Sequence, residues 1–199
     1  MSKNGYLVFK RCMDVIASLL FLIAASPLLL ILVILIRLDS KGAVIFRQSR
    51  VGKGGKIFRI YKFRTMKIDA PKHIATKDLQ DPYKYITRMG MFLRKTSIDE
   101  LPQLFNVLKG DMSIIGPRPL IEKESKIHLL RYKAGVYDLR PGITGWAQIN
   151  GRDDIEDEEK VMYDREYAER LSFSFDVKIF FGSIIVVFKR DGYKEGKHR

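Results

Sequence analysis

The sequence is poor in the residues from which disulfides and zinc sites are built. Cys12 is its only cysteine, which excludes an internal disulfide and a cysteine-based zinc site. The three histidines, His73, His128 and His198, are scattered along the chain, so we expect no histidine-rich metal site either. The sequence also contains no internal repeat and no low-complexity stretch.

The best-known glycine-rich phosphate-binding motifs are missing as well. Neither Gly-x-x-x-x-Gly-Lys-Ser/Thr nor Gly-x-Gly-x-x-Gly occurs, so an ordinary P-loop or Rossmann nucleotide site is unsupported. Acidic residues are the minority charge: 36 Lys and Arg against 23 Asp and Glu give 199 residues a net charge of +13. The length suits one domain with a real core, and the charge favours an anionic partner such as nucleic acid, a membrane surface or a phosphorylated substrate.

Residues 15–36 form a long apolar run without a charged residue. As a straight helix the run would be about 33 Å long, which matches the ~30 Å hydrocarbon core of a bilayer. A single transmembrane span is therefore the simplest interpretation. A cleaved signal peptide fits less well. Ala24, Ala25 and Ser26 resemble a cleavage site, but Pro27 follows them directly and the apolar run continues to Ile36.

Two features favour a re-entrant helix over a span. Ser26 and Pro27 lie in the middle of the run, where Pro27 removes the backbone hydrogen bond to Ile23 and the Ser26 hydroxyl can satisfy a freed carbonyl. Basic residues also flank the run on both sides: Lys3, Lys10 and Arg11 before it, and Arg37, Lys41, Arg47, Arg50, Lys53 and Lys56 after it. Since positive flanks prefer the cytoplasm, a helix that enters and leaves by the same face satisfies both, with a span as the alternative.

We predict a fold of the α+β class that is mainly helical, with residues 1–40 as the membrane segment and 41–199 as the soluble domain. Residues 43–46 and 57–64 are predicted strands, joined into a β-hairpin by the glycine-rich turn at 52–55. The hairpin end carries Lys62 and Arg64 on one side of the strand. Taken alone, these would be the solvated charges of an edge strand.

Helices are predicted at residues 88–94, 101–108, 122–132, 156–171 and 177–188. The last is too short to span and is rich in phenylalanine with flanking cations, so it fits either a membrane-interface helix or a buried core helix. Residues 70–85 are predicted to form a polar loop, and residues 140–146 and 150–152 are predicted to be turns.

An acidic pair, Asp99 and Glu100, precedes a leucine-rich helix. Either Ser97 caps this helix in a capping box with Glu100, or Asp99 is the cap and Pro102 lies in the first turn. In both cases the helix dipole favours ionised carboxylates. Capping alone would explain such a pair, but Arg118 follows between Pro117 and Pro119, a stiff setting suited to an arginine aimed at a phosphate.

These and other blocks together resemble the bacterial sugar transferases, the monotopic phosphoglycosyl transferases, over about residues 9–190. The blocks are Phe9-Lys10-Arg11 with Asp14, Ser26-Pro27, Tyr61–Met66, Arg94–Val107, Gly110–Ser113, Gly116-Pro117-Arg118-Pro119 and Arg140–Arg152. The chain looks like the minimal form of that family, because the multi-span N-terminal part of larger members is absent. Ile98 stands where leucine is common, which is a conservative change.

The resemblance implies a two-step transfer of a sugar-1-phosphate from a UDP-sugar to polyprenyl phosphate, with release of UMP. It implies that Asp99 is the nucleophile with Mg²⁺ beside it, and that Glu100 is its partner. Arg118 would position phosphate with Pro117 and Pro119 holding it, and the other implied basic site residues are Arg94, Lys62 and Arg64. Ser26 and Pro27 would be the helix break.

The implied location is the cytoplasmic face of the bacterial inner membrane, with UDP-sugar, polyprenyl phosphate and anionic lipids as partners and no nucleic acid. An oligomer remains open. The rival interpretations are a membrane-anchored basic module that binds lipid or nucleic acid, a lipid-phosphate hydrolase, and a metal-dependent glycosyltransferase. A basic module would explain the charge and the apolar ends, but not the acidic pair or the stiff Pro117-Arg118-Pro119 turn.

Overall fold

In the computed structural model, residues 2–71, 79, 81–151 and 155–189 are described. The helices are α1 (Lys3–Asp39), α2 (Arg88–Lys95), α3 (Gln103–Lys109), α4 (Ser125–Lys133), α5 (Trp146–Ile149), α6 (Asp157–Glu169) and α7 (Phe173–Lys189). The 3₁₀ turns are η1 (Lys53–Gly55), η3 (Pro82–Lys84), η4 (Ile98–Glu100) and η5 (Val136–Asp138). The strands are β1 (Ile45–Val51), β2 (Ile57–Phe63), β3 (Ser113–Ile115) and β4 (Gly142–Thr144).

The first helix, α1, is long and apolar, and it keeps most of its large side chains exposed. Its buried residues are Tyr6, Asp14, Ser18, Leu22, Leu32 and Ile36. By length and composition it is the one helix among the described residues that could cross a membrane. Its exposed apolar surface, from Val8 to Leu38, differs from that of a soluble core helix, which would be mostly buried. The structure therefore has a helix that could be embedded in a membrane.

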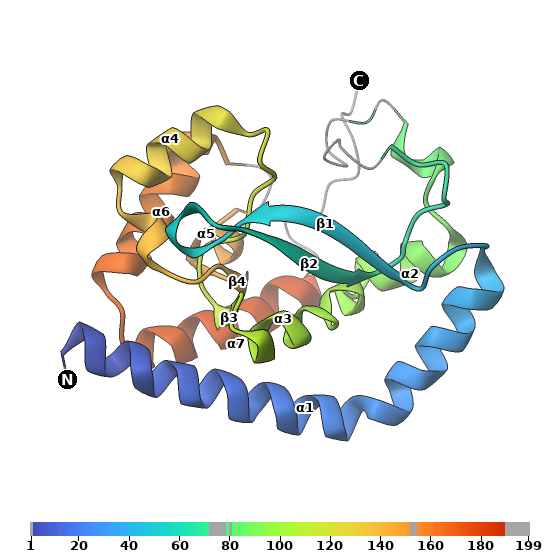
Figure 1. Ribbon diagram of the computed structural model, residues 1–199, viewed down its shortest axis with the longest axis horizontal. Helices are drawn as coiled ribbons and strands as arrows, with labels where there is room; N and C mark the ends of the chain where they lie inside the picture. Colours follow the sequence, from blue (N-terminus) through green and yellow to red (C-terminus); the bar gives the residue numbers. More distant parts are fainter. Residues whose placement is uncertain (1, 72–78, 80, 152–154, 190–199) are drawn as a thin grey trace.

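The helix runs without interruption through Pro27, where the sequence predicted two halves separated by a break. The hydroxyl of Ser26 donates a 2.8 Å hydrogen bond to the carbonyl of Ile23, the group that Pro27 leaves without its usual helical donor. This replacement bond allows proline inside a continuous helix. Figure 1 shows that α1 runs along the lower edge of the molecule and bends upward in its second half.

The predicted hairpin is confirmed, with a longer first strand than the sequence suggested. Strands β1 and β2 pair antiparallel over seven residues each, from Ile45 opposite Phe63 to Val51 opposite Ile57. The first strand extends past residue 46 because its polar residues alternate between exposed and half-buried positions, as a strand covered on one face requires. At the turn, Gly54 and Gly55 have positive φ angles of 65° and 74°.

A parallel pair of short strands, β3 and β4, was not predicted. Ser113 lies opposite Gly142, and Ile115 lies opposite Thr144. Glycines make this contact possible: a Cβ on Gly142 would lie 2.1 Å from the backbone nitrogen of Gly116, and one on Gly145 would lie 2.2 Å from the Gly116 carbonyl oxygen. The pairing brings the segment after residue 116 against the segment after residue 140.

The predicted helices are present with shifted ends. The helix at 88–94 extends to Lys95, the one predicted at 122–132 is Ser125–Lys133, and the one predicted at 156–171 is Asp157–Glu169. The last helix begins four residues before its predicted start, at Phe173. Within the predicted loop at 70–85, Pro82–Lys84 forms a 3₁₀ turn, while residues 72–78 and 80 lie outside the described residues, as does Arg152 of the predicted turn at 150–152.

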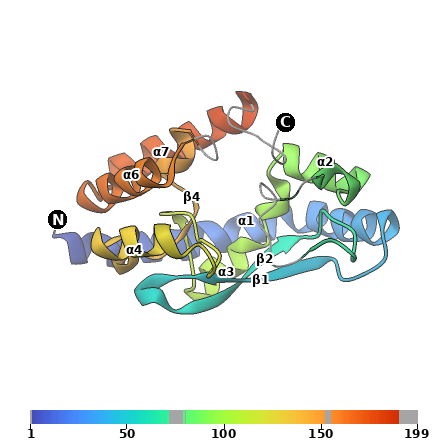
Figure 2. The same cartoon turned by 90° about the horizontal axis from the view of Figure 1, so that it is seen from above.

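The last helix, α7, packs one narrow face inward and leaves a wide apolar face exposed. Phe175 and Ile179 are buried, whereas Phe180, Phe181 and Phe188 are exposed. A buried core helix would hide these rings, so the exposure favours the interfacial interpretation. Figure 2 shows α6 and α7 on one side of α1 and the hairpin on the other.

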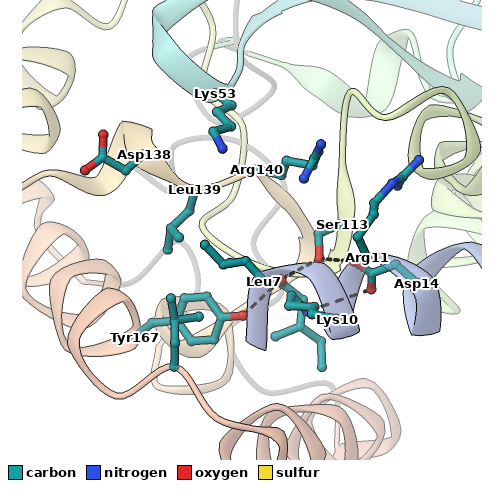
Figure 3. A pocket seen from close by; sticks show the side chains of 12 residues that line it. Leu7, Lys10, Arg11, Asp14, Lys53, Ser113, Asp138, Leu139, Arg140 and Tyr167 are labelled. Carbon is teal, nitrogen blue, oxygen red and sulfur yellow. Dashed lines mark hydrogen bonds and ion pairs between the residues drawn. The ribbon is translucent and has the colours of Figure 1, made fainter. Parts of the chain in front are cut away.

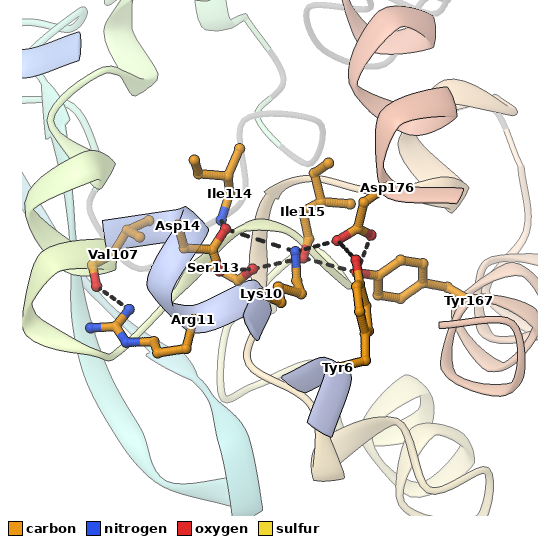
Figure 4. A network of polar contacts seen from close by, with 10 residues as sticks. All are labelled: Tyr6, Lys10, Arg11, Asp14, Val107, Ser113, Ile114, Ile115, Tyr167 and Asp176. Carbon is orange, nitrogen blue, oxygen red and sulfur yellow. Dashed lines mark hydrogen bonds and ion pairs between the residues drawn. The ribbon is translucent and has the colours of Figure 1, made fainter. Parts of the chain in front are cut away.

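A polar cluster fastens the first half of α1 to β3, α6 and α7 (Figure 4). We call it the anchoring cluster, and it consists of Tyr6, Lys10, Asp14, Ser113, Tyr167 and Asp176. Its carboxylates accept hydrogen bonds from hydroxyl groups: Asp14 from Ser113 at 2.7 Å, and Asp176 from Tyr6 at 2.6 Å and from Tyr167 at 2.8 Å. Lys10 and Asp14, from the first of the family-like blocks, thus help to hold the apolar helix against the rest of the domain.

Candidate functional site

The acidic pair lies on a tight turn between α2 and α3. Ser97 adopts a left-handed conformation with φ of 56°, and Ile98–Glu100 then form η4. The capping-box prediction was wrong, because the Ser97 side chain makes no cap hydrogen bond and α3 begins only after Pro102. The alternative prediction, that Asp99 caps the helix, was also wrong, because the residue that precedes α3 is Pro102. A proline at this position costs little, since the first helical turn needs no backbone donor there.

The candidate site consists of Lys62, Asp99, Glu100 and Arg118, which come from β2, η4 and the loop after β3. Lys62 Nζ lies 2.6 Å from Glu100 Oε1 and 3.9 Å from Asp99 Oδ2. Both Nη atoms of Arg118 lie 3.4 Å from the same Glu100 oxygen. Glu100 is therefore held between two cations, while Asp99 lies beside them.

Asp99 is 9% exposed, and this burial raises the pKa of its carboxyl group to about 6. The charges of Lys62, Arg94 and Arg118 lower the pKa, and that of Glu100 raises it. The helix-dipole argument predicted an easily ionised acid, but desolvation is the larger effect here. Near neutral pH the group is an ionised carboxylate that is poorly solvated, and such a carboxylate is a more reactive nucleophile than one in water.

The arginine between two prolines is held at its backbone and partly open at its side chain. The carbonyl of Pro117 accepts from the Gly142 nitrogen at 2.9 Å, while the Arg118 side chain is 42% exposed. The stiff turn expected from Pro117 and Pro119 thus packs on the segment before β4. Its guanidinium points to Glu100 and remains accessible to a ligand.

Arg94 approaches the same place from α2. A Cβ on Gly90 would lie 2.0 Å from the Thr65 carbonyl oxygen, so the absence of a side chain at Gly90 lets α2 pack closely on the chain after β2. Arg94 Nη1 lies 3.3 Å from Thr65 Oγ1, and its charge acts on Asp99. The structure therefore brings Arg94 near the candidate site.

Arg64 is placed elsewhere. Its guanidinium donates to the carbonyls of Ile36 at 3.0 Å, Ser40 at 2.5 Å and Ala43 at 2.7 Å, and the residue is 9% exposed. These are the carbonyls at and just beyond the C-terminal end of α1. The structure thus gives Arg64 a structural position at the end of the apolar helix, apart from the residues that face Asp99.

Three residues near the site carried no distinguishing signal in the sequence. Arg50 donates to the Pro119 carbonyl at 3.0 Å, and Arg131 donates to the Arg118 carbonyl at 2.7 Å and to Asp164 at 2.6 Å. Each is a charged residue within a strand or helix that has other charges. Only the packing of β1 and α4 against the turn, and of α6 against α4, distinguishes them.

Two cavities among the described residues can be compared with the candidate site. One of about 40 Å³ lies between the start of α1 and η5 and includes Lys10, Asp14 and Arg140 in its lining (Figure 3). The other, about 490 Å³, is lined by Ile45, Arg47, Tyr61, Pro102, Phe105, Leu108 and Lys109. Neither is lined by Asp99 or Arg118, so the candidate site rests on its charge geometry.

In the part of the chain that the structure describes, no three His, Cys, Asp or Glu side chains are grouped as metal ligands. The donors available at the site are the two carboxylates of Asp99 and Glu100. Mg²⁺ commonly binds through one or two carboxylates together with substrate phosphates. The donor set therefore fits a magnesium ion that arrives with a phosphorylated substrate, and it does not fit a closed protein site.

Sequence comparison agrees with this geometry. Residues 5–190 match the bacterial sugar transferase family. A UDP-glucose:undecaprenyl-phosphate glucose-1-phosphate transferase of Escherichia coli K12 is 42% identical, over 92% of this chain and 40% of that relative. An N-acetylgalactosaminephosphotransferase of Aeromonas hydrophila, which uses UDP-N-acetylgalactosamine and undecaprenyl phosphate, is 42% identical over 90% of this chain and 43% of that relative.

The chain spans only about two fifths of the length of these two relatives. A third relative, the uncharacterized sugar transferase EpsL of Bacillus subtilis 168, is 38% identical over 96% of this chain and 93% of its own length. From the family match over most of the chain and this end-to-end similarity, we conclude that the chain belongs to the bacterial sugar transferase family.

Proposed function

We propose that this chain transfers a sugar-1-phosphate from a UDP-sugar to polyprenyl phosphate, undecaprenyl phosphate in particular, through a covalent aspartyl intermediate. The observation that carries the proposal is the buried Asp99 carboxylate beside Lys62, Glu100 and Arg118, in a member of this family. The activities for which the E. coli and A. hydrophila relatives are named support the substrate classes.

In the first step, an oxygen of Asp99 attacks the phosphorus that carries the sugar. The bond from that phosphorus to the oxygen bridging the two phosphates breaks, and UMP leaves with the bonding electrons. The product is a mixed anhydride between Asp99 and the sugar-1-phosphate. Covalent catalysis of this kind divides one difficult transfer into two in-line displacements.

In the second step, a phosphate oxygen of the polyprenyl phosphate attacks the same phosphorus. The bond to Asp99 breaks, the carboxylate is restored, and polyprenyl diphosphate sugar is formed. Glu100 is the group we assign to accept a proton from the lipid phosphate. It lies between Lys62 and Arg118, the two cations that would bind the lipid phosphate beside it.

The cations offset the repulsion between a carboxylate nucleophile and a diphosphate. Arg118 is the phosphate-positioning group, because its backbone is held and its side chain is accessible. Lys62 and Arg94 add positive charge around Asp99. Arg64 is not assigned a substrate contact, since its guanidinium binds the end of α1.

We propose Mg²⁺ as the cofactor, held by Asp99 together with the substrate diphosphate. When bound, the ion would neutralise charge on the phosphates and stabilise the leaving UMP. Because the described residues offer the site two adjacent carboxylates and no third, we expect the ion to bind weakly until the nucleotide sugar is present.

We further propose that residues 1–40 form a re-entrant membrane segment on the cytoplasmic face of the bacterial inner membrane, with residues 41–199 as the cytoplasmic catalytic domain. The support comes from positive charge on both flanks of α1, its exposed apolar surface and its curvature in Figure 1. The apolar face of α7 would lie at the interface beside anionic lipids.

The proposed product is the first lipid-linked intermediate of a bacterial surface glycoconjugate, such as a capsule, O-antigen, exopolysaccharide or protein-linked glycan. Such a pathway needs neither a nucleic acid partner nor a particular oligomer. A polyprenyl diphosphate sugar is a substrate for enzymes that add further sugars. We therefore expect glycosyltransferases to consume the product at the same membrane face.

The deciding experiment assays UMP release from a panel of UDP-sugars, with and without polyprenyl phosphate. We expect one UDP-sugar to support turnover, and Asp99→Asn to bind membranes normally but release no UMP. Mass spectrometry without lipid should find Asp99 carrying a sugar phosphate. Full turnover by Asp99→Asn would refute the nucleophile, and phosphate release without UMP would indicate a lipid-phosphate hydrolase.

Topology is tested in a Cys12→Ser background, which removes the single native thiol. Lys3→Cys and Lys41→Cys variants are treated with a membrane-impermeant thiol reagent on intact and on inverted membranes. A re-entrant helix exposes both positions on the cytoplasmic side. Labelling from opposite sides would establish a span.

A further inference from the structure

The loop that carries Arg118 is held by its backbone carbonyls from four directions. The Pro117 carbonyl accepts from the Gly142 nitrogen at 2.9 Å, and the Leu120 carbonyl accepts from the Val51 nitrogen at 3.0 Å. Between them, the Arg118 carbonyl accepts from Arg131 and the Pro119 carbonyl from Arg50. Prolines at two of these positions have no N–H, so the carbonyls are the backbone groups through which the turn can be held.

The bond to the Arg118 carbonyl comes from a buried ion pair. Arg131 Nη1 donates to that carbonyl at 2.7 Å, and Arg131 Nη2 donates to Asp164 Oδ2 at 2.6 Å. The two side chains are only 4% and 2% exposed. Asp164 on α6 therefore orients the guanidinium of Arg131 on α4, and this guanidinium holds the residue that faces Glu100.

Stability alone is a weak reason for this arrangement. A buried ion pair can often be replaced by apolar side chains with little or no loss of stability, because removing two charges from water is expensive. In addition, Arg131 Nε is buried without a hydrogen-bond partner among the described residues. The guanidinium thus binds both the turn and Asp164, while its Nε–H group is left without a hydrogen bond among the described residues.

We propose that Arg131 and Asp164 are positioning residues that aim the Arg118 guanidinium at the substrate diphosphate. This inference rests on the proposed function and deepens it. Arg50 supports the same orientation from the other side, because it binds the next carbonyl and its charge repels Arg118. Arg118 is then directed toward Glu100 and the place beside Asp99.

The test is a double-mutant cycle on UMP release. The first change, Arg131→Met with Asp164→Leu, removes both charges and so leaves no lone buried ion. The second change is Arg118→Ala. With Arg118 present, the apolar pair should lower kcat/KM for the UDP-sugar at least tenfold, at a nearly unchanged melting temperature. In the Arg118→Ala background, the same pair should lower kcat/KM less than twofold, because no guanidinium remains to be aimed.

A matched control joins the same two helices without touching the turn. Lys126 on α4 lies 2.7 Å from Glu158 on α6, and both are exposed. Lys126→Gln with Glu158→Gln should leave kcat/KM unchanged in both backgrounds. Equal losses from the apolar pair with and without Arg118 would overturn the positioning role and indicate a purely structural one.

If the apolar pair does not fold, Arg131→Lys replaces it in the cycle, because one ammonium keeps the charge but cannot bind both oxygens as the planar guanidinium does. Failure of the proposed function would appear separately, as no UMP release by the unaltered chain from any UDP-sugar. The cycle is then measured on UDP binding by calorimetry. Non-additive losses of affinity support the positioning role, and additive losses overturn it.

Discussion

Two clusters in this protein have nearly the same charged groups and distances. In the anchoring cluster, Lys10 Nζ lies 2.7 Å from an oxygen of Asp176 and 3.8 Å from one of Asp14. In the candidate site, Lys62 Nζ lies 2.6 Å from an oxygen of Glu100 and 3.9 Å from one of Asp99. A lysine between two carboxylates therefore does not by itself distinguish a structural cluster from a reactive site.

The hydrogen bonds of the second carboxylate make the difference. Asp14 accepts from the Ser113 hydroxyl at 2.7 Å and from the Ile114 nitrogen at 3.2 Å. Among the described residues, Asp99 receives no hydrogen bond, and burial raises its pKa to about 6. A carboxylate with its lone pairs occupied serves as a fixed structural group, whereas one without them keeps an oxygen available for bond formation.

The largest expected effect separates the two clusters by activity. Asp99→Asn should reduce UMP release by roughly 10³-fold or more, as loss of a nucleophile does. Its melting temperature should not fall, because the raised pKa means that the ionised form of Asp99 destabilises the fold. Kinetics and thermal unfolding on one preparation measure both. A residual rate within tenfold of the original would contradict the contrast.

The next effect is on stability and belongs to the anchoring cluster. Asp176→Ala leaves the half-buried Lys10 without its 2.7 Å partner and also removes the acceptor for two tyrosines. We expect a loss of about 3–5 kcal/mol, or about 10 °C in melting temperature, with the activity per folded molecule nearly preserved.

The exposed Glu169, paired with Arg165 on α6, provides the control for this loss. Glu169→Gln should change the melting temperature by no more than about 2 °C. An equal loss in the two variants would mean that the anchoring cluster is no more than ordinary surface charge.

The pH dependence should report the raised pKa of Asp99. The attacking form is the carboxylate, so the rate should rise with pH through about 6 and level above it. Because Lys62 lowers that pKa, Lys62→Met should move the acid limb to higher pH, by about one unit or more. The exposed Lys109 serves as control, and Lys109→Met should leave the limb in place. An acid limb at the ordinary pH of a solvated aspartate would contradict the buried site.

The smallest effect removes one neutral donor from the anchoring cluster. Ser113→Ala deletes the 2.7 Å hydrogen bond to Asp14 and should cost about 1–2 kcal/mol in thermal or denaturant unfolding. Ser18 on α1 offers a matched control, since it is fully buried but its hydroxyl has no hydrogen-bond partner among the described residues. Ser18→Ala should therefore be neutral or slightly stabilising.

Local patterns predicted those parts of the fold that depend on neighbours in sequence. Alternation along β2 and the apolar spacing of α3 depend only on strand and helix periodicity, so the hairpin and helix were foreseen. The Ser26 and Pro27 pair predicted a compensating bond, and that bond is present. The start of α3 was predicted too early, because Ser97 adopts a left-handed conformation. Residues other than glycine rarely do so, and a serine in the sequence does not predict it.

Contacts between distant segments could not be predicted in the same way. Short strands such as β3 and β4 carry too few residues for a periodic signal, and their pairing depends on three glycines that also fit ordinary turns. Arg64 and Lys62 occupy the same side of a strand, yet one binds the end of α1 and the other reaches Glu100. The spacing of the two cations in the sequence does not predict which of them lies at the candidate site.

On the proposed function, the position of Arg64 fixes the distance between the candidate site and the membrane surface. It binds the carbonyls of Ile36 and Ser40, where α1 ends, and Lys62 lies two residues earlier in the chain, which is about 7 Å in an extended strand. This segment therefore fixes the distance between the C-terminal end of α1 and the lysine beside Asp99. On the proposed function, this length holds the reacting carboxylate at the depth of lipid headgroups, so the phosphate of a membrane-dissolved carrier can meet it without its tail leaving the bilayer.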